Sequence, residues 1–109
     1  MNTFSQLGLS PKTVEVLEKI GFKNPTPVQE KAIPQLLSPK PIDFIGLAQT
    51  GTGKTAAFVL PILNHLITTK RKGKGPRILI ISPTRELANQ ISDSIKTYSR
   101  YLKIFSVTI

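Results

Sequence analysis

The sequence predicts an α/β fold in which helices flank a parallel β-sheet. Short continuous apolar runs, typical of strands buried on both faces, alternate with longer segments whose apolar residues recur at helical spacing. This alternation favours parallel strands joined by right-handed crossover helices. A glycine-rich segment, residues 48–55, lies between the first apolar run and the helix that follows it. We therefore expect a nucleotide-binding α/β fold that reaches about three strands.

Two helices are expected before the sheet. Ser10 and Pro11 suit the N-cap and the first position of a helix, and Gly21 suits its C-terminal end. After a turn, Thr26 is expected to begin a second helix with one apolar face. Pro34 should kink this helix, because proline lacks the N–H that an interior helical position donates.

The remaining elements are predicted from apolar runs and breakers. In order, they are a strand at 43–47, a helix from 54 to 68 or 69, a basic loop at 70–77, a strand at 77–82, a helix that starts after Pro83-Thr84 and runs through Leu102, and a strand at 104–109. We expect residues 1–38 to form an N-terminal helical segment and residues 39–109 to form the start of the nucleotide-binding α/β domain.

Composition narrows the classes of function. The 109 residues suit one small domain, with 39% hydrophobic and 19% charged residues, and they include no cysteine, which excludes a disulfide framework and a thiolate metal site. The lone His65 is expected on the polar face of its helix. No secretory signal and no apolar run of bilayer length are evident, so we expect a cytoplasmic protein without a membrane partner.

The net charge of +9 favours a polyanionic partner. Part of this excess comes from the run 70–77, where glycines and a proline indicate a loop. A solvated surface loop is the more common role of such a run, and a nucleic-acid patch is the alternative.

Residues 48–55, Ala-Gln-Thr-Gly-Thr-Gly-Lys-Thr, have the composition of a phosphate-binding loop. Small residues let the backbone N–H groups point at an anion, while Lys54 adds positive charge and Thr55 offers a hydroxyl to Mg²⁺. Ala48 stands where the strict pattern has its first glycine. The alternative is a plain Gly/Thr turn, but the preceding strand and the following helix are the context that the motif needs.

Three segments together resemble the motifs of DEAD-box RNA helicases of the bacterial type. Residues 21–29 resemble the Q motif, residues 48–55 resemble motif I, in which alanine at the first position is usual, and residues 83–88 resemble motif Ia. Phe4 matches an aromatic residue that the family places upstream of the Q motif. Order and spacing agree as well as composition, and the resemblance covers essentially the whole sequence.

This resemblance implies a RecA-like fold that binds ATP. Gln29 would recognise adenine, because its carboxamide both donates and accepts hydrogen bonds. Phe22 would stack on the base, and Thr26 would form a hydrogen bond near it. Lys54 and Thr55 would have the catalytic roles, and the Thr55 hydroxyl would bind Mg²⁺. The residues that contact the phosphates and Mg²⁺ would be Gln49, Thr50, Gly51, Thr52, Gly53, Lys54 and Thr55.

The resemblance also implies contact with single-stranded RNA. Pro83, Thr84 and Arg85 would touch its sugar–phosphate backbone without reading the sequence.

The roles of Gln29, Phe22 and Arg85 each have a structural alternative. Gln29 has the spacing from Thr26 of a capping box and could simply close its own helix. Phe22 could be only a core residue. Arg85 could be only a charged residue at the end of a helix, although a cation is mildly unfavourable in a first turn.

The carboxylates that hydrolysis needs are not evident. An ATPase uses one carboxylate to hold Mg²⁺ and another to orient water, which the family supplies in an Asp-Glu-Ala-Asp segment on a later strand. The acids of this sequence, none adjacent to another, are Glu15, Glu18, Glu30, Asp43, Glu86 and Asp93. We therefore expect the leading part of the first helicase domain, which alone should neither hydrolyse ATP nor unwind duplexes.

Two further hypotheses stay open at this point. The chain could be a naturally short, non-catalytic module that binds nucleotide or RNA. It could also be a different P-loop ATPase in which Gln29 serves only as a cap. In any of these cases, a sheet that stopped at its third strand would leave an unpaired apolar edge at 104–109, so we expect a tendency to aggregate.

Overall fold

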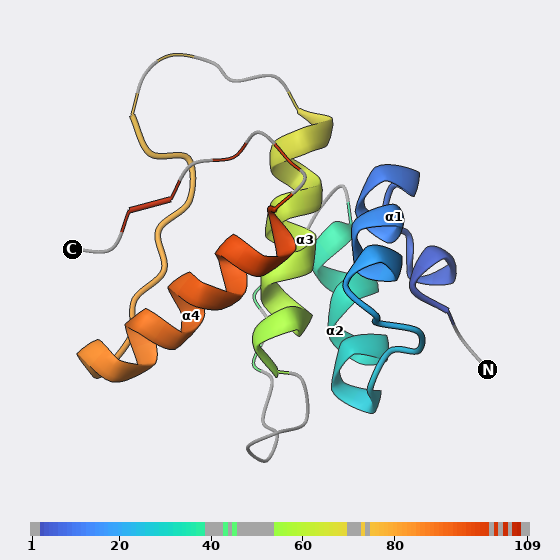
Figure 1. Cartoon of the computed structure of the whole chain (residues 1–109), viewed down its shortest axis with the longest axis horizontal. Helices are drawn as coiled ribbons and strands as arrows, with labels where there is room; N and C mark the ends of the chain where they lie inside the picture. The colour runs from blue at the N-terminus through green and yellow to red at the C-terminus, as the bar shows by residue number, and fades with distance from the viewer. Residues whose placement is uncertain are drawn as a thin grey trace.

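The computed structural model describes residues 3–38, 43, 45, 54–69, 73, 75–100, 102, 104, 106 and 107. All regular elements within these ranges are helices (Figure 1). They are a short 3₁₀ helix η1 and four α-helices, with the bounds η1 Phe4–Leu7, α1 Pro11–Lys19, α2 Pro27–Leu37, α3 Lys54–Thr68 and α4 Arg85–Tyr98.

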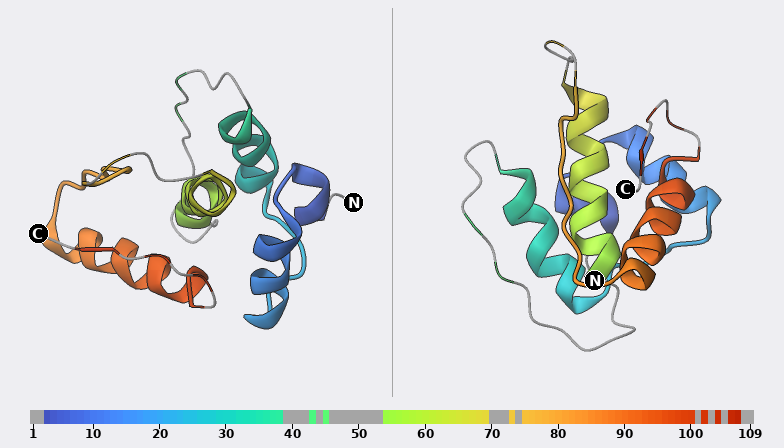
Figure 2. Two further views of the ribbon diagram at one scale, coloured as in Figure 1. Left: turned by 90° about the horizontal axis from the view of Figure 1, so that it is seen from above. Right: turned by 90° about the vertical axis from the view of Figure 1, so that its left-hand side faces the viewer.

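Helix α3 lies at the centre of the molecule. Figure 1 shows α4 on one side of it and α1 with α2 on the other, and Figure 2 shows the same arrangement from two further directions. The helix packs against α1, α2 and α4, and most extensively against α2. It is buried on more than one face, as expected for a helix that is apolar nearly all round, and its buried residues are Ala56, Ala57, Val59, Leu60, Pro61, Leu63 and Asn64.

Two apolar clusters hold the helices together. The first cluster joins η1, α1, α2 and α3 through Phe4, Leu7, Leu9, Leu17, Ile33, Ala56 and Leu60. The second cluster joins α1 and α3 to the segment after α4 through Val16, Val59, Leu63 and Leu102. Because α3 contributes to both clusters, the helix is held from two sides, and Ala56 anchors its first turn in the first cluster.

The predicted ends of α1 are confirmed. Ser10 is the N-cap, and its hydroxyl accepts a hydrogen bond from the Thr13 N–H at 3.4 Å. At the other end, Gly21 has a φ of 92°, which a residue with a side chain rarely adopts. The N–H of Gly21 donates to the carbonyl of Glu18 at 3.2 Å, and the N–H of Phe22 donates to that of Leu17 at 2.9 Å. This is a Schellman motif, and it sets where the chain leaves α1.

Helix α4 is shorter than predicted. It ends at Tyr98, and the prediction that it runs through Leu102 is wrong. After Tyr98 the backbone forms tighter turns, in which Arg100 N–H donates to the Thr97 carbonyl at 3.4 Å and Leu102 N–H donates to the Ser99 carbonyl at 2.8 Å. Leu102 is nevertheless buried in the second cluster. Its apolar spacing therefore reflected burial, which does not require a continuous helix.

The strand predicted at 77–82 is not present among the described residues. This segment has no regular structure, and the side chains of Leu79 and Ile81 are 82% and 85% exposed. A parallel strand forms only by pairing with neighbouring strands, and its apolar residues are buried only when helices cover both faces. Most of the other two predicted strands, 43–47 and 104–109, falls outside the described residues, so the structure does not test them.

Arg77 ties the end of the basic run to α3. Its guanidinium donates to the carbonyl oxygen of Leu66 at 3.4 Å and to the hydroxyl of Thr69 at 2.5 Å. A cation is favourable at the C-terminal end of a helix, where carbonyl groups lack helical partners. Arg77 therefore stabilises the end of α3, whereas half of the run, residues 70–72 and 74, lies outside the described residues.

A buried polar contact also fixes α1 on α3. Asn64 is 7% exposed, and its Oδ1 accepts hydrogen bonds from the backbone N–H of Ser10 at 2.8 Å and from the hydroxyl of Thr13 at 3.1 Å. Both donors belong to the start of α1. One side-chain oxygen of α3 therefore satisfies two groups of the neighbouring helix.

Replacing Asn64 with alanine should lower the free energy of unfolding by about 1–3 kcal/mol, because the buried Thr13 hydroxyl and the partly buried Ser10 N–H then lose their acceptor. Urea denaturation of both proteins measures this loss. Asn89, an exposed asparagine on α4, is the matched control, and its replacement by alanine should change stability by less than about 0.5 kcal/mol. Equal effects of the two substitutions would contradict the role of Asn64.

Candidate nucleotide-binding site

Lys54 and Thr55 are the first two residues of α3. Lys54 is exposed and Thr55 is half-buried, while the next residue, Ala56, is 1% exposed. The N-terminal end of a helix carries partial positive charge and unpaired N–H groups, and the first turn of α3 contains no acid. This end is therefore suited to an anion. The other predicted phosphate contacts, Gln49, Thr50, Gly51, Thr52 and Gly53, lie outside the described residues.

Thr26 and Gln29 form the start of α2. Gln29 is 3% exposed, and its Oε1 accepts a hydrogen bond from the Thr26 backbone N–H at 2.9 Å. The capping interaction considered from the sequence is thus present. The Thr26 hydroxyl faces the backbone of Gln29 but is buried without a hydrogen-bond partner in the described part of the chain.

The cap does not exclude recognition of a ligand by Gln29. A carboxamide oxygen has two lone pairs, and its NH₂ group carries two donors. The bond from Thr26 uses one of these lone pairs. It also holds the buried side chain in one orientation, which favours a defined hydrogen-bonding pattern at the start of α2.

Phe22 is half-buried and lies between two other aromatic rings. Its ring stacks with that of Phe4 at a centroid distance of 6.5 Å and meets the ring of Tyr98 edge-on at 5.6 Å. Phe22 also packs against the first cluster, so it is partly a core residue, as the structural alternative expected. Burial raises the pKa of the Tyr98 hydroxyl above its usual range. The contact with Tyr98 could not be predicted from the sequence, in which only the apolar spacing of the helix marks Tyr98.

The structure brings the starts of α2 and α3 to the same end of the molecule. Figure 1 shows both helices beginning at the lower end of the view, and the right-hand panel of Figure 2 shows the same. The two helices pack along their length. The residues at the start of α2, Thr26 and Gln29, therefore share one end of the fold with Lys54 and Thr55.

Pro83, Thr84 and Arg85 are exposed at the start of α4. Thr84 is the N-cap, and its Oγ1 accepts a hydrogen bond from the Leu87 N–H at 3.1 Å. Arg85 is the first helical residue and makes no side-chain hydrogen bond or ion pair within the described ranges. These residues lie at the end of α4 opposite Tyr98, so the structure places them apart from the aromatic contact of Phe22.

The described residues do not make a metal site by themselves. They contain no group of three or more His, Cys, Asp or Glu side chains that could hold a metal ion. Mg²⁺ takes six oxygen ligands and commonly shares them with substrate phosphates and water. The hydroxyl of Thr55 fits one such ligand position, next to the helix end that suits a phosphate.

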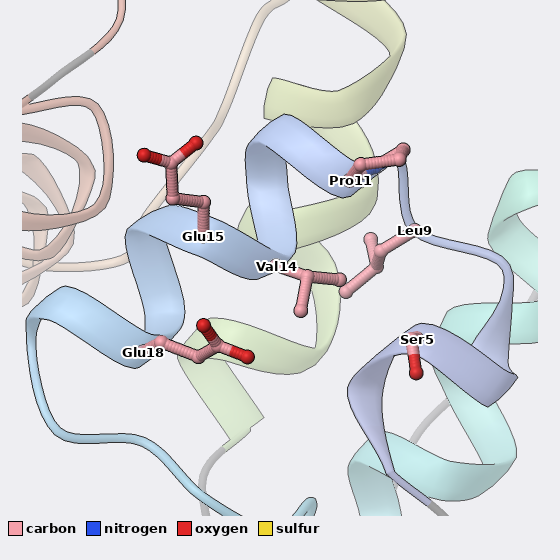
Figure 3. Close-up of a pocket in the computed structure, with 6 residues that line it drawn as sticks. All are labelled: Ser5, Leu9, Pro11, Val14, Glu15 and Glu18. Atoms are coloured by element: carbon pink, nitrogen blue, oxygen red, sulfur yellow. The ribbon is translucent and has the colours of Figure 1, made fainter.

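A surface cavity of about 430 Å³ lies elsewhere, between η1 and α1 (Figure 3). Its lining residues are Ser5, Leu9, Pro11, Val14, Glu15 and Glu18. The two carboxylates would repel a phosphate, and Glu15 already pairs with Lys19 at 3.3 Å. This cavity is therefore a poor candidate for the nucleotide.

Comparison with known proteins decides the family. A model of the DEAD/DEAH box helicases matches residues 26–109, most of the chain. The chain belongs to the DEAD/DEAH box helicase family. This helicase chain is 46% identical over 110 residues to the ATP-dependent RNA helicase SrmB of Escherichia coli (strain K12), an alignment that covers all of this chain and 24% of SrmB.

Solved helicase structures show the same arrangement. The RNA helicase Prp28 from Chaetomium thermophilum bound to ADP superimposes with a TM-score of 0.87 and 38% identity, covering 100% of this chain and 26% of Prp28. Dbp5 of S. cerevisiae bound to RNA and ADP BeF₃ gives a TM-score of 0.82 and 34% identity, covering 95% and 26%. The predicted α/β, RecA-like fold class of this DEAD/DEAH box helicase chain is thereby confirmed.

The helicase chain spans about a quarter of the length of each of these relatives. Within its described ranges, none of the helices has both the length and the apolar character needed to cross a bilayer.

Proposed function

We propose that this chain provides the ATP-binding and RNA-contacting part of an ATP-dependent RNA helicase. The observation that carries the proposal is the packing of α2 on α3 with both N-terminal ends at one end of the molecule (Figure 1). A base-recognising residue on α2 and phosphate-binding residues on α3 can then engage one nucleotide. SrmB is named an ATP-dependent RNA helicase, and Prp28 was solved with ADP, which supports a nucleotide ligand.

Lys54 and Thr55 would hold the phosphate end of ATP. The Lys54 ammonium is exposed and free to move toward the β- and γ-phosphates, and the Thr55 hydroxyl would bind Mg²⁺. The bound Mg²⁺ would offset phosphate charge. Nucleotide binding, rather than hydrolysis, is the activity that these residues support, because the chain has no pair of adjacent carboxylates.

Gln29 and Phe22 would bind the adenine end. The Gln29 carboxamide is buried and fixed by the bond from Thr26, so it can distinguish the donor and acceptor pattern of adenine from that of guanine. Phe22 would provide a planar apolar surface for the base.

Replacing Gln29 with alanine should lower the preference for ATP over GTP roughly tenfold, because the fixed donor and acceptor are lost. Isothermal titration with both nucleotides gives this ratio. The ratio is the useful quantity, because the variant also loses a helix cap worth about 1 kcal/mol of stability. Gln35, an exposed glutamine on α2, is the matched control. An unchanged ratio in Gln29→Ala would leave Gln29 as a helix cap only and would contradict its proposed contact with adenine.

Pro83, Thr84 and Arg85 would contact the RNA backbone. All three are exposed, and the start of α4 offers N–H groups and the cation of Arg85 to a phosphate. Backbone contacts of this kind do not depend on sequence, and the net charge of +9 would strengthen them at low salt. Dbp5, solved with RNA and ADP BeF₃, supports the proposal. A cytoplasmic location, expected from the sequence, remains a prediction.

A further inference from the structure

The backbone of Phe22 is held firmly at the end of α1. Gly21 adopts the left-handed conformation that the Schellman motif needs, and the Phe22 N–H is bonded to the carbonyl of Leu17 at 2.9 Å. This motif commonly brings the side chain after the glycine against the last turn of the helix. Leu17 and Phe22 both belong to or pack against the first cluster. The position of the Phe22 Cα is therefore set by local structure.

The direction of the Phe22 ring depends on more distant contacts. Phe4 stacks with it from η1, with an angle of 26° between the rings. Tyr98, the last residue of α4, contacts the Phe22 ring edge-on, with an angle of 69° between the two rings. Edge-to-face pairs are favourable beyond the area that they bury, and the centroids of these two rings lie 5.6 Å apart. Tyr98 thus restrains a ring that lies far away in the sequence.

Tyr98 has an unusual place in the packing. It packs against both apolar clusters, whereas its neighbour on the same face of α4, Ile95, packs against the second cluster. Figure 1 and the left-hand panel of Figure 2 show the C-terminal end of α4 turned toward the centre of the molecule, with its other end pointing outward. Tyr98 is therefore placed to transmit the position of α4 to the ring of Phe22.

We propose that Tyr98 is a positioning residue that holds the Phe22 ring in the orientation in which it receives the adenine base. The proposal rests on the proposed function, in which Phe22 contacts the base. None of the three sequence motifs contains Tyr98. Its effect should appear in the binding of the base and not in the binding of the phosphates.

The test compares two ligands by isothermal titration of the 109-residue chain. ADP reports on base and phosphates together, and pyrophosphate reports on the phosphate site alone. Tyr98→Leu should weaken ADP binding roughly threefold to tenfold, the range that one aromatic pair contributes, and leave pyrophosphate binding unchanged. Tyr98→Phe keeps the ring and should restore the affinity for ADP.

Two further variants show whether Tyr98 acts through Phe22. In a chain that already carries Phe22→Leu, the substitution Tyr98→Leu should have no additional effect on ADP binding. Ile95→Ala removes apolar packing from the same helix face without touching Phe22, so it should leave the ratio of the two affinities unchanged.

The outcomes separate this inference from the proposed function. Parallel loss of ADP and pyrophosphate binding in Tyr98→Leu overturns the inference, because Tyr98 would then support the fold as a whole. An undiminished effect of Tyr98→Leu beside Phe22→Leu overturns it too. If Phe22→Leu weakens ADP binding and Tyr98→Leu does not, only the inference fails. If Phe22→Leu has no effect, the proposed contact of Phe22 with the base fails, and the inference fails with it.

Discussion

Replacing Lys54 with alanine should weaken ADP binding by roughly tenfold to a hundredfold. A hydrogen bond to a charged group contributes about 1.5–3 kcal/mol, and the variant would remove both the proposed bond of Lys54 to the phosphates and its full positive charge. Lys54 is exposed, at the first position of α3, so its loss leaves no buried gap. Isothermal titration measures the affinity, and thermal melting should show an unchanged fold.

Lys12 provides a matched control for this variant. It is also an exposed lysine in the first turn of a helix, in this case α1. Lys12→Ala lowers the net charge by the same amount, so a general effect of charge would appear in both variants. Similar losses of ADP affinity in the two variants would show nonspecific attraction and would count against a phosphate site at the start of α3.

Replacing Leu60 with alanine should lower the free energy of unfolding by about 2–5 kcal/mol, because it leaves a cavity in a packed core. The side chain is 1% exposed and belongs to the first cluster, which joins four elements. A small domain has only about 5–15 kcal/mol of stability in total, so this one substitution should remove a large share of it. Chemical denaturation followed by circular dichroism measures the loss.

Leu79 provides the matched control for Leu60, because it is an exposed leucine. It carries the same side chain, but it is 82% exposed in a segment without regular structure. Leu79→Ala should therefore change stability by less than about 0.5 kcal/mol. A loss as large as that of Leu60→Ala would show that residues 77–82 are packed as a buried strand in solution, contrary to the structure.

The helices could be predicted because their signals are local. A capping residue, a following proline and a terminal glycine mark the ends of α1, and the structure confirms each one. The end of α4 and the segment 77–82 could not be predicted in the same way. Leu102 keeps the apolar spacing of a helix that has already ended. A strand requires partners from other parts of the chain, and an apolar run does not show whether it has them.

In the candidate site, too, local features could be predicted from the sequence and a long-range contact could not. Lys54 was placed correctly at the start of a helix, because motif and helix start coincide in sequence. The bond between Thr26 and Gln29 was visible from their spacing of three residues. The contact between Phe22 and Tyr98 was not, because it joins two residues far apart in the chain whose types alone indicate only burial.

The central position of α3 has a consequence for the order in which the chain can fold during synthesis. Helices α1 and α2 are made first, but the first cluster that buries them also needs Ala56 and Leu60 of α3. The Ser10 N–H and the Thr13 hydroxyl likewise lack the acceptor Asn64 until α3 has been synthesised. At about 5–20 residues added per second, α1 and α2 are therefore synthesised before their packing partner on α3 exists. Their apolar faces stay open to other chains and to chaperones until the middle of α3 has left the exit tunnel.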